Sequence, residues 1–196
     1  MQSAEPVRSL TNTFNFLRGL IFVPLGLYLL LGAGWWSWYE VWKPISDGLA
    51  LILLLTSIWL VNLYYSQSFG RVEEDSRNGI RKASMLVAMP IAMLVSGMWD
   101  GINRPSISVF GLTIAAFILL YAWATVGFRL RYVVFSALVA GTSFLPVLGI
   151  ATYDQTHGVV MPIVLGVSLI VVGVMDHVLL VRRVRLVQNK VGAYQS

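Results

Sequence analysis

The chain of 196 residues contains no cysteine, and Lys, Arg, Asp and Glu together make up only 12% of it. Without cysteine, the sequence has no disulfide bonds and no thiol chemistry. Soluble domains usually carry about 25% charged residues, so this shortage of charge excludes an ordinary water-soluble domain. Because 57% of the residues are apolar, the composition also excludes a disordered chain. We therefore expect one domain, residues 1–196, whose surroundings are lipid.

The apolar residues are gathered in six continuous blocks, each close to the roughly 20 residues that cross a bilayer as a helix. Continuous blocks favour helices over barrel strands, which alternate apolar and polar residues. The predicted fold class is all-α, a polytopic membrane protein with six transmembrane helices. The predicted spans are residues 16–34, 48–65, 83–99, 107–128, 132–152 and 159–181.

Basic side chains are distributed unequally between the two sides that these spans define. The N-terminal tail, the loops after the second and fourth spans and the C-terminus hold twelve of them, whereas the three opposite loops hold only Lys43 and Arg104. Cytoplasmic segments carry such an excess, so both termini are predicted to be cytoplasmic. The net charge of +5 then reflects topology and attraction to anionic lipid, and not nucleic-acid binding. A bacterial inner membrane is the expected location, since no Asn-x-Ser/Thr glycosylation acceptor is present.

Prolines divide the six spans into three tandem helical hairpins. One set lies inside the odd-numbered spans, where proline bends a helix, and the other lies at the entrances of the even-numbered spans, where its missing N–H costs nothing. The first set is Pro24, Pro90 and Pro146, and the second is Pro44, Pro105 and Pro162.

Three tandem hairpins resemble the HdeD-like family, small bacterial inner-membrane proteins built from two-helix repeats. The likeness covers nearly the whole chain and is carried by architecture and by local strings at residues 58–61, 115–120 and 128–131. The resemblance implies an association with acid resistance and offers no catalytic residues to transfer. The sequence departs from the family in its Trp-rich first outer loop and in the adjacent Asp176 and His177.

Asp176 and His177 form the clearest polar site inside a predicted span. Helical spacing places them beside a stripe that contains Gly166 and Gly173, where a neighbouring helix can approach closely. Ionisable residues in a membrane are costly, and they indicate function by default. An acid beside an imidazole suits a proton or cation relay. The alternative is an Asp176 that lies near the inner interface and pairs with an arginine.

We expect Asp176 to face protein rather than lipid. Its candidate partners are Arg182 and Arg183, which lie closer to the cytoplasm, and Asn62, at a similar depth in the second span. The candidate intramembrane polar site therefore consists of Asp176, His177 and Asn62.

The first outer loop holds the densest aromatic cluster, with Trp35, Trp36, Trp38 and Trp42. Indole rings favour the lipid headgroup level, so an interfacial belt is one interpretation. The other is a lid over an outward-facing pocket that grips an apolar or cationic ligand by stacking. The chain is similar in size and topology to the six-helix substrate-binding components of vitamin importers, in which the first outer loop gates the pocket.

Motifs of the common enzyme classes are missing from the sequence. It has no phosphate-binding loop, no nucleophile elbow and no zinc-binding helix, and His157 and His177 fall on opposite sides of the membrane. We therefore expect a non-enzymatic protein with no cofactor and no metal site. Two functions stay open: a small-solute transport or substrate-binding membrane component, with a small-molecule ligand, or an accessory stress-related membrane protein that acts through a membrane or cytoplasmic protein partner.

Overall fold

The computed structural model describes residues 19–35, 43–69, 76–125 and 129–193. These residues form helices joined by turns and loops, without a β-strand among them, so the prediction of an all-α fold is confirmed. The long helices are α2 (Phe22–Trp35), α3 (Lys43–Phe69), α4 (Ser76–Asn103), α5 (Val109–Thr125), α6 (Leu130–Thr142) and α8 (Met161–Ala193). The short ones are η1 (Gly19–Ile21), α7 (Tyr153–Gln155) and η2 (Thr156–Val160).

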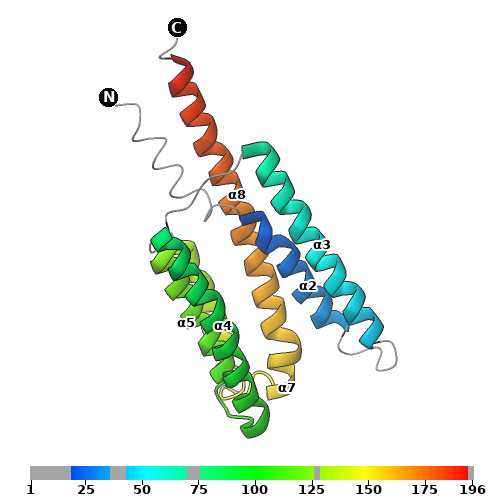
Figure 1. Cartoon of the computed structure of the whole chain (residues 1–196). Helices are drawn as coiled ribbons and strands as arrows, with labels where there is room; N and C mark the ends of the chain where they lie inside the picture. Colours follow the sequence, from blue (N-terminus) through cyan, green and yellow to red (C-terminus); the bar gives the residue numbers. More distant parts are fainter. Residues whose placement is uncertain (1–18, 36–42, 70–75, 126–128, 194–196) are drawn as a thin grey trace.

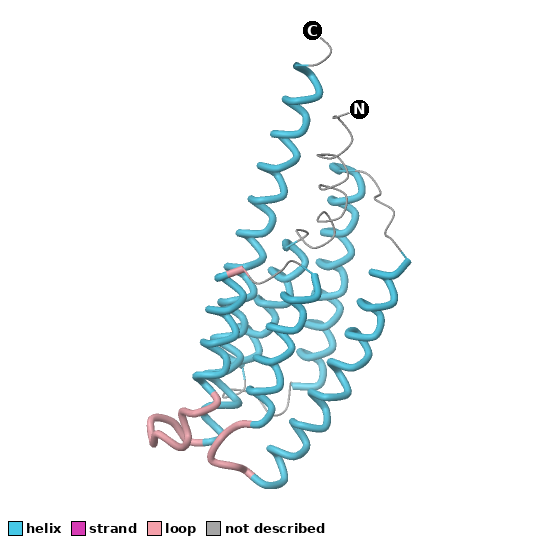
Figure 2. The backbone as a smooth tube through the Cα atoms, turned by 90° about the vertical axis from the view of Figure 1, so that its left-hand side faces the viewer, coloured by secondary structure: helices cyan, strands magenta, loops and turns pink. Residues whose placement is uncertain are grey.

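The helices run up and down in alternating directions, with α8 between a pair formed by α2 and α3 and a group formed by α4, α5 and α6 (Figure 1). The end of the bundle at which α2 begins and α8 ends is called the terminal end below. The opposite end, called the loop end, carries α7 and the loops 104–108 and 143–152 (Figure 2).

Two of the described helices are long and apolar enough to cross a membrane. They are Gly48–Phe69 within α3 and Tyr153–Leu186, in which α7, η2 and α8 form one continuous helix. Shorter apolar helices cover Gly19–Gly32, Val109–Trp123 and Leu130–Thr142. This length and composition suggest a protein that associates with a membrane.

The surface of α3 is strongly apolar. Its side chains Leu51, Ile52, Leu53, Leu55 and Trp59 are between 48% and 66% exposed. Soluble monomers rarely expose contiguous apolar patches of this kind, whereas such a surface suits lipid.

The main core lies where α5, α6 and α8 meet. Ile114 of α5, Phe135 and Val139 of α6, and Met161 and Val172 of α8 are buried there. A smaller core lies at the terminal end, where Tyr65 of α3 and Leu180 of α8 are completely buried.

Helices α2 and α8 approach each other closely at paired glycines. A Cβ atom on Gly26 would lie 2.6 Å from the carbonyl oxygen of Gly166, and one on Gly173 would lie 2.6 Å from that of Gly19. No larger residue fits at these separations without a shift of the backbone. The prediction that the glycine stripe of the last helix admits a neighbouring helix is thus confirmed, and that neighbour is α2.

The three predicted hairpins, α2–α3, α4–α5 and α6–α8, are each in contact. The most extensive packing nevertheless joins α2 to α8 and α5 to α6, which are elements of different hairpins. The bundle is therefore held together mainly across the hairpin boundaries.

Helix α6 ends ten residues before the end of the predicted span at residue 152, and this boundary was wrong. It stops at Thr142, and Pro146 lies in the turns at residues 143–149 instead of inside a helix. The ring of a proline clashes with the carbonyl group four residues earlier, which is that of Thr142. The turns avoid this clash.

Pro162 lies inside a continuous helix, and not at its entrance as predicted. The helix begins at Tyr153 and widens into the π-helical turn η2, where the N–H of Met161 bonds to the carbonyl oxygen of Thr156. A widened turn accommodates a proline that cannot donate a hydrogen bond. The last helix therefore starts six residues upstream of the predicted position, and His157 lies within it.

The remaining prolines are close to their predicted places. Pro90 lies inside α4, and Pro44 lies at the entrance of α3. Pro105 lies in the loop before α5, and Pro24 lies in the first turn of α2, nearer to a helix start than predicted.

Candidate functional site

Asp176 lies on α8 toward the terminal end, and its side chain is completely buried. The Tyr132 hydroxyl donates a hydrogen bond of 2.6 Å to Oδ2 of this carboxylate. The guanidinium group of Arg131 forms an ion pair with Oδ1. Both partners lie in the first turn of α6, so Asp176 faces protein as predicted and links α6 to α8.

The arginine that pairs with Asp176 is Arg131, and the predicted partners Arg182 and Arg183 were wrong. Arg183 follows Asp176 by seven residues, which places it roughly 10 Å farther along the helix axis, and Arg182 is exposed. Arg131 could have been identified as the partner from its position at the start of the fifth predicted span. In an antiparallel bundle, the start of one span lies beside the end of the next span, where Asp176 lies.

The ion pair lowers the free-energy cost of burying the Asp176 carboxylate. A buried carboxylate without a partner costs several kcal/mol, whereas a positive charge and a hydrogen bond offset most of this cost. The compensation is incomplete on the arginine side, because Nε of Arg131 is buried without a hydrogen-bond partner among the described residues. The pair is therefore held mainly by charge.

His177 contacts a different helix from Asp176. Its Nδ1 lies 3.1 Å from the hydroxyl oxygen of Tyr65 on α3, and its ring lies beside those of Tyr64 and Tyr65. The same hydroxyl oxygen accepts a hydrogen bond of 3.2 Å from the N–H of Leu20. The Tyr65 hydroxyl group therefore links His177 of α8 to the backbone of η1.

Two of the three residues of the predicted polar site, Asp176 and His177, contact different helices. Asn62 lies on α3, half-buried and one turn before Tyr65. Among the described residues, the contacts of the Asp176 carboxylate come from α6, whereas His177 contacts α3. The neighbouring Asp176 and His177 therefore tie α8 to two different helices.

The aromatic cluster of the first outer loop lies largely outside the described residues. Trp35 is the last residue of α2, and Trp36, Trp38 and Trp42 fall in the undescribed segment 36–42. The lid and the interfacial belt both stay predictions.

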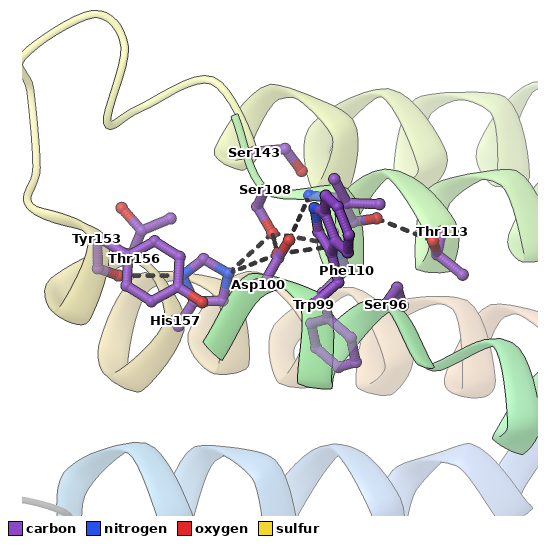
Figure 3. Close-up of polar contacts among 12 residues, drawn as sticks. Ser96, Trp99, Asp100, Ser108, Phe110, Thr113, Ser143, Tyr153, Thr156 and His157 are labelled. Carbon is purple, nitrogen blue, oxygen red and sulfur yellow. Dashed lines mark hydrogen bonds and ion pairs between the residues drawn. The ribbon is translucent and has the colours of Figure 1, made fainter. Parts of the chain in front are cut away.

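A second polar cluster, which the sequence did not reveal, lies at the loop end (Figure 3). Asp100 of α4 and Ser108 are 1% and 0% exposed. The Ser108 hydroxyl donates a bond of 2.8 Å to Oδ2 of Asp100, and the N–H groups of Val109 and Phe110 donate bonds of 3.1 and 2.9 Å to the same carboxylate. The N–H of Gly111 donates to Oγ of Ser108 at 3.0 Å. Asp100 and Ser108 together cap the start of α5, whose first N–H groups have no acceptor within the helix.

His157 joins this cluster from η2. Its Nε2 lies 2.8 Å from Oγ of Ser108 and 3.3 Å from Oδ2 of Asp100, and its Nδ1 lies 3.0 Å from the carbonyl oxygen of Tyr153. The Tyr153 ring stacks on the imidazole with 4.0 Å between the ring centroids (Figure 3). The Tyr153 carbonyl oxygen accepts only, so Nδ1 is the donor in its contact with that oxygen.

The cluster contains Ser, His and Asp, but its arrangement differs from that of a hydrolytic triad. In a triad the histidine lies between the serine and the aspartate and takes the serine proton. Here the Ser108 hydroxyl bonds directly to Asp100 and is fully buried. The arrangement suits a helix cap that also contacts His157, and this contact docks the start of the last helix on the α4–α5 turn. A serine directly before an apolar run is the helix-start signal that could have indicated it.

Among the residues that the structure describes, no group of three or more His, Asp or Glu side chains is placed so that it could hold a metal ion. Comparison of the chain with protein-family models, curated proteins and solved structures finds no match.

Proposed function

We propose that the chain is a multi-pass protein of the bacterial inner membrane, with six membrane-crossing helices and both termini in the cytoplasm. The spacing of the two polar clusters along one helix carries this proposal. His157 and Asp176 lie nineteen residues apart, which is roughly 28 Å at about 1.5 Å per residue and close to the hydrocarbon thickness of about 30 Å. Between them Ser168 is the one hydrophilic side chain.

The distribution of arginines supports the orientation. Arg129 and Arg131 at the start of α6, and Arg182, Arg183 and Arg185 near the end of α8, belong to the terminal end. The loop end carries Arg104. An excess of arginine marks the cytoplasmic side, so the terminal end is proposed to face the cytoplasm.

Cysteine labelling tests this topology directly, because the native chain has no cysteine that would give background. The exposed positions Ser106, at the loop end, and Gln67, at the terminal end, are replaced singly by cysteine. A membrane-impermeant maleimide should label Ser106→Cys in intact cells and Gln67→Cys only after permeabilisation. The reverse pattern, or equal labelling of both variants, would contradict the proposed orientation.

Within the membrane, we propose a non-enzymatic accessory role that is exerted through a protein partner. The burial of Asp176 supports this role over a relay, because a relay carboxylate needs contact with water, with a ligand or with a group that exchanges protons near neutral pH, and tyrosine and arginine do not. Asp176 is completely buried, and Arg131 and Tyr132 occupy its oxygens. The resemblance to HdeD-like proteins, which are associated with acid resistance, points in the same direction.

Small-solute transport is the second candidate, and one observation favours it. The continuous helix Tyr153–Leu186 carries two histidines, and each lies beside an aspartate: His177 follows Asp176 in the chain, and Nε2 of His157 lies 3.3 Å from Oδ2 of Asp100 on α4. Histidines that exchange protons on opposite sides of a membrane are useful in proton-coupled transport.

Proton flux into proteoliposomes separates the two candidates. With an internal pH-sensitive dye and an imposed pH gradient, the accessory role predicts no flux above that of empty vesicles. Flux through the native protein that is abolished by Asp176→Asn, with insertion unchanged, would establish transport and contradict the accessory role.

A further inference from the structure

The polar cluster at the loop end has one hydroxyl hydrogen for two acceptors when His157 is neutral (Figure 3). Nδ1 of the ring donates to the Tyr153 carbonyl oxygen, so a neutral ring carries only a lone pair on Nε2. This lone pair lies 2.8 Å from Oγ of Ser108 and 3.3 Å from Oδ2 of Asp100. The single hydroxyl hydrogen of Ser108 can reach Nε2 or Oδ2, which is also 2.8 Å away, but it cannot bond fully to both. A neutral ring therefore leaves a lone pair facing a carboxylate oxygen.

A second proton on the ring removes this conflict. Nε2 then donates toward Oγ of Ser108 and Oδ2 of Asp100, and the hydroxyl hydrogen stays on the carboxylate. The positive ring also faces a carboxylate that is 1% exposed, and charge-assisted hydrogen bonds are stronger than neutral ones. The closed contact thus holds a proton more tightly than a broken contact does. A fall in pH consequently favours the closed contact, and a rise in pH weakens it.

Other titratable or charged side chains lie on the elements around the ring. They are Arg104 in the loop after α4, Tyr153 and Asp154 on α7, and Tyr28 on α2, which also packs against η2. Arg104 and Asp154 are exposed, and the Tyr153 ring stacks on the imidazole. Helix α8, which continues from η2, carries no titratable side chain before Asp176. Among these residue types, histidine is the one that ordinarily changes charge between pH 5 and 8.

The helix can bend at the position of His157. The π-helical turn η2 contains this residue, and its last hydrogen bond runs from the N–H of Met161 to the carbonyl oxygen of Thr156. Pro162 follows directly and has no N–H to donate. Helices kink at π-helical turns and at prolines. The short α7 is therefore joined to α8 through a turn that can bend, and the side chain of His157 ties that turn to Asp100 and Ser108.

We propose that His157, Ser108 and Asp100 form a pH-dependent clasp, which holds the start of the last helix on the α4–α5 turn when the ring is protonated and loosens when the ring is neutral. The clasp changes the position of one helix end and needs no proton flux across the membrane. In the proposed orientation the loop end faces away from the cytoplasm, so the clasp responds to the pH outside. The side to which it responds rests on the proposed topology, whereas the clasp itself does not.

Hydrogen exchange of the full chain in mild detergent tests the clasp. It is measured at about pH 5 and at about pH 8, between which histidine ordinarily changes charge, and is corrected for the intrinsic pH dependence of amide exchange. Residues 153–157 of the native chain should be about tenfold more protected at the lower pH, which is the ratio that one hydrogen bond to a charged group gives. The last turns of α5 are the internal reference and should be equally protected at both pH values.

Matched variants assign the effect to the clasp. His157→Gln should make the protection of residues 153–157 the same at both pH values, whereas His177→Gln, which removes the other histidine of the chain, should keep the tenfold difference. Asp100→Asn keeps the shape of the side chain but removes the charge that faces the ring, so it should reduce the difference. Asp154→Asn removes the same charge from an exposed neighbour and should preserve it.

Several outcomes would overturn the clasp. They are equal protection of the native chain at both pH values, greater protection at the higher pH, a His157→Gln variant that keeps the difference, and a His177→Gln variant that loses it. Failure of the proposed topology is distinguishable, because the exchange measurement in detergent does not depend on it. Labelling of Ser106→Cys only after permeabilisation would contradict the orientation alone, and the clasp would then respond to cytoplasmic pH.

Discussion

A buried aspartate lies toward each end of the bundle, Asp100 of α4 at the loop end and Asp176 of α8 toward the terminal end, and the two carboxylates are satisfied in different ways. Asp100 at the loop end accepts hydrogen bonds from a hydroxyl and two backbone N–H groups and lies against His157. Asp176 at the terminal end has one hydroxyl and one guanidinium group, both from α6. The first carboxylate chiefly caps the start of α5, whereas the second joins α6 to α8.

This difference shows where the fold depends on charge. Removal of Asp100 leaves a hydroxyl and two backbone N–H groups without their acceptor, and all three groups are neutral. Removal of Asp176 leaves a buried guanidinium group without its counter-charge. We therefore expect the terminal end to be far more sensitive to a lost carboxylate than the loop end.

The largest expected effect is that of Asp176→Asn. This change keeps the shape of the side chain and removes the charge that pairs with Arg131, so we expect a loss of about 3 kcal/mol or more in unfolding free energy. Thermal unfolding in detergent, followed by circular dichroism, measures the loss. Joint replacement, Asp176→Leu with Arg131→Met, should recover most of the stability, and a single variant as stable as the native protein would contradict the role of the pair.

The second prediction compares two glycines of the same helix. Gly173, one turn before Asp176, meets the carbonyl oxygen of Gly19, whereas Gly158, next to His157, has open space around its missing Cβ. Gly173→Ala should therefore cost about 1–3 kcal/mol through overpacking. Gly158→Ala should be neutral or slightly stabilising because alanine is the better helix former. Equal effects in the same unfolding assay would show that α2 does not constrain α8 near Asp176.

Asp100→Ala is expected to have a smaller effect than Asp176→Asn. It removes the acceptor for the N–H groups of Val109 and Phe110, and loss of a helix cap costs about 1–2 kcal/mol. Hydrogen exchange should be faster in the first turn of α5 and unchanged in its last turns. The control Asp154→Asn changes the same charge at an exposed neighbouring position and should preserve the native exchange pattern. Uniformly faster exchange over α5 and α6 would contradict a purely local role for Asp100.

The smallest expected effect is that of Tyr65→Phe. It removes the hydroxyl group that contacts His177 and Leu20 while the ring packing stays, so we expect a loss of about 1 kcal/mol. Tyr64→Phe is the matched control, because the neighbouring ring is 41% exposed. If both variants lose the same stability, the hydroxyl of Tyr65 contributes nothing specific.

The sequence predicts the helices better than their ends. Continuous apolar blocks identify α3 and α8, because a hydrophobic run of 18 or more residues with few charges is typical of a membrane-crossing helix. The end of α6 at Thr142 was missed because Pro146 was assigned to the inside of a membrane helix, where proline is often tolerated. Whether a proline bends a helix or ends it depends on whether neighbouring groups donate a hydrogen bond to the freed carbonyl oxygen, and this is a tertiary property.

The candidate site was predictable only in part. The burial of Asp176 follows from its place beside Gly166 and Gly173, since only a packed face carries such a stripe. Its pairing with Arg131 depends on which helix lies beside α8, and one sequence does not encode that neighbour in any local pattern. The cluster of Asp100, Ser108 and His157 was missed for the same reason, because His157 lies 49 residues after Ser108 and reaches it through η2.

The shortness of α6 has a consequence for the lipid around the protein. A helix of 13 residues is about 20 Å long, or ~10 Å less than the hydrocarbon core. The turns that follow it expose Val147, Leu148 and Ile150, and the N–H of Leu148 bonds to the carbonyl oxygen of Phe144 at 3.1 Å. In the proposed membrane location, annular lipids beside α6 meet a shorter apolar wall than those beside α3, and we expect the bilayer to be thinner on that side of the molecule. Hydrophobic mismatch of this kind costs fractions of a kcal/mol per Å and favours short-chain lipids or a neighbour with an equally short span.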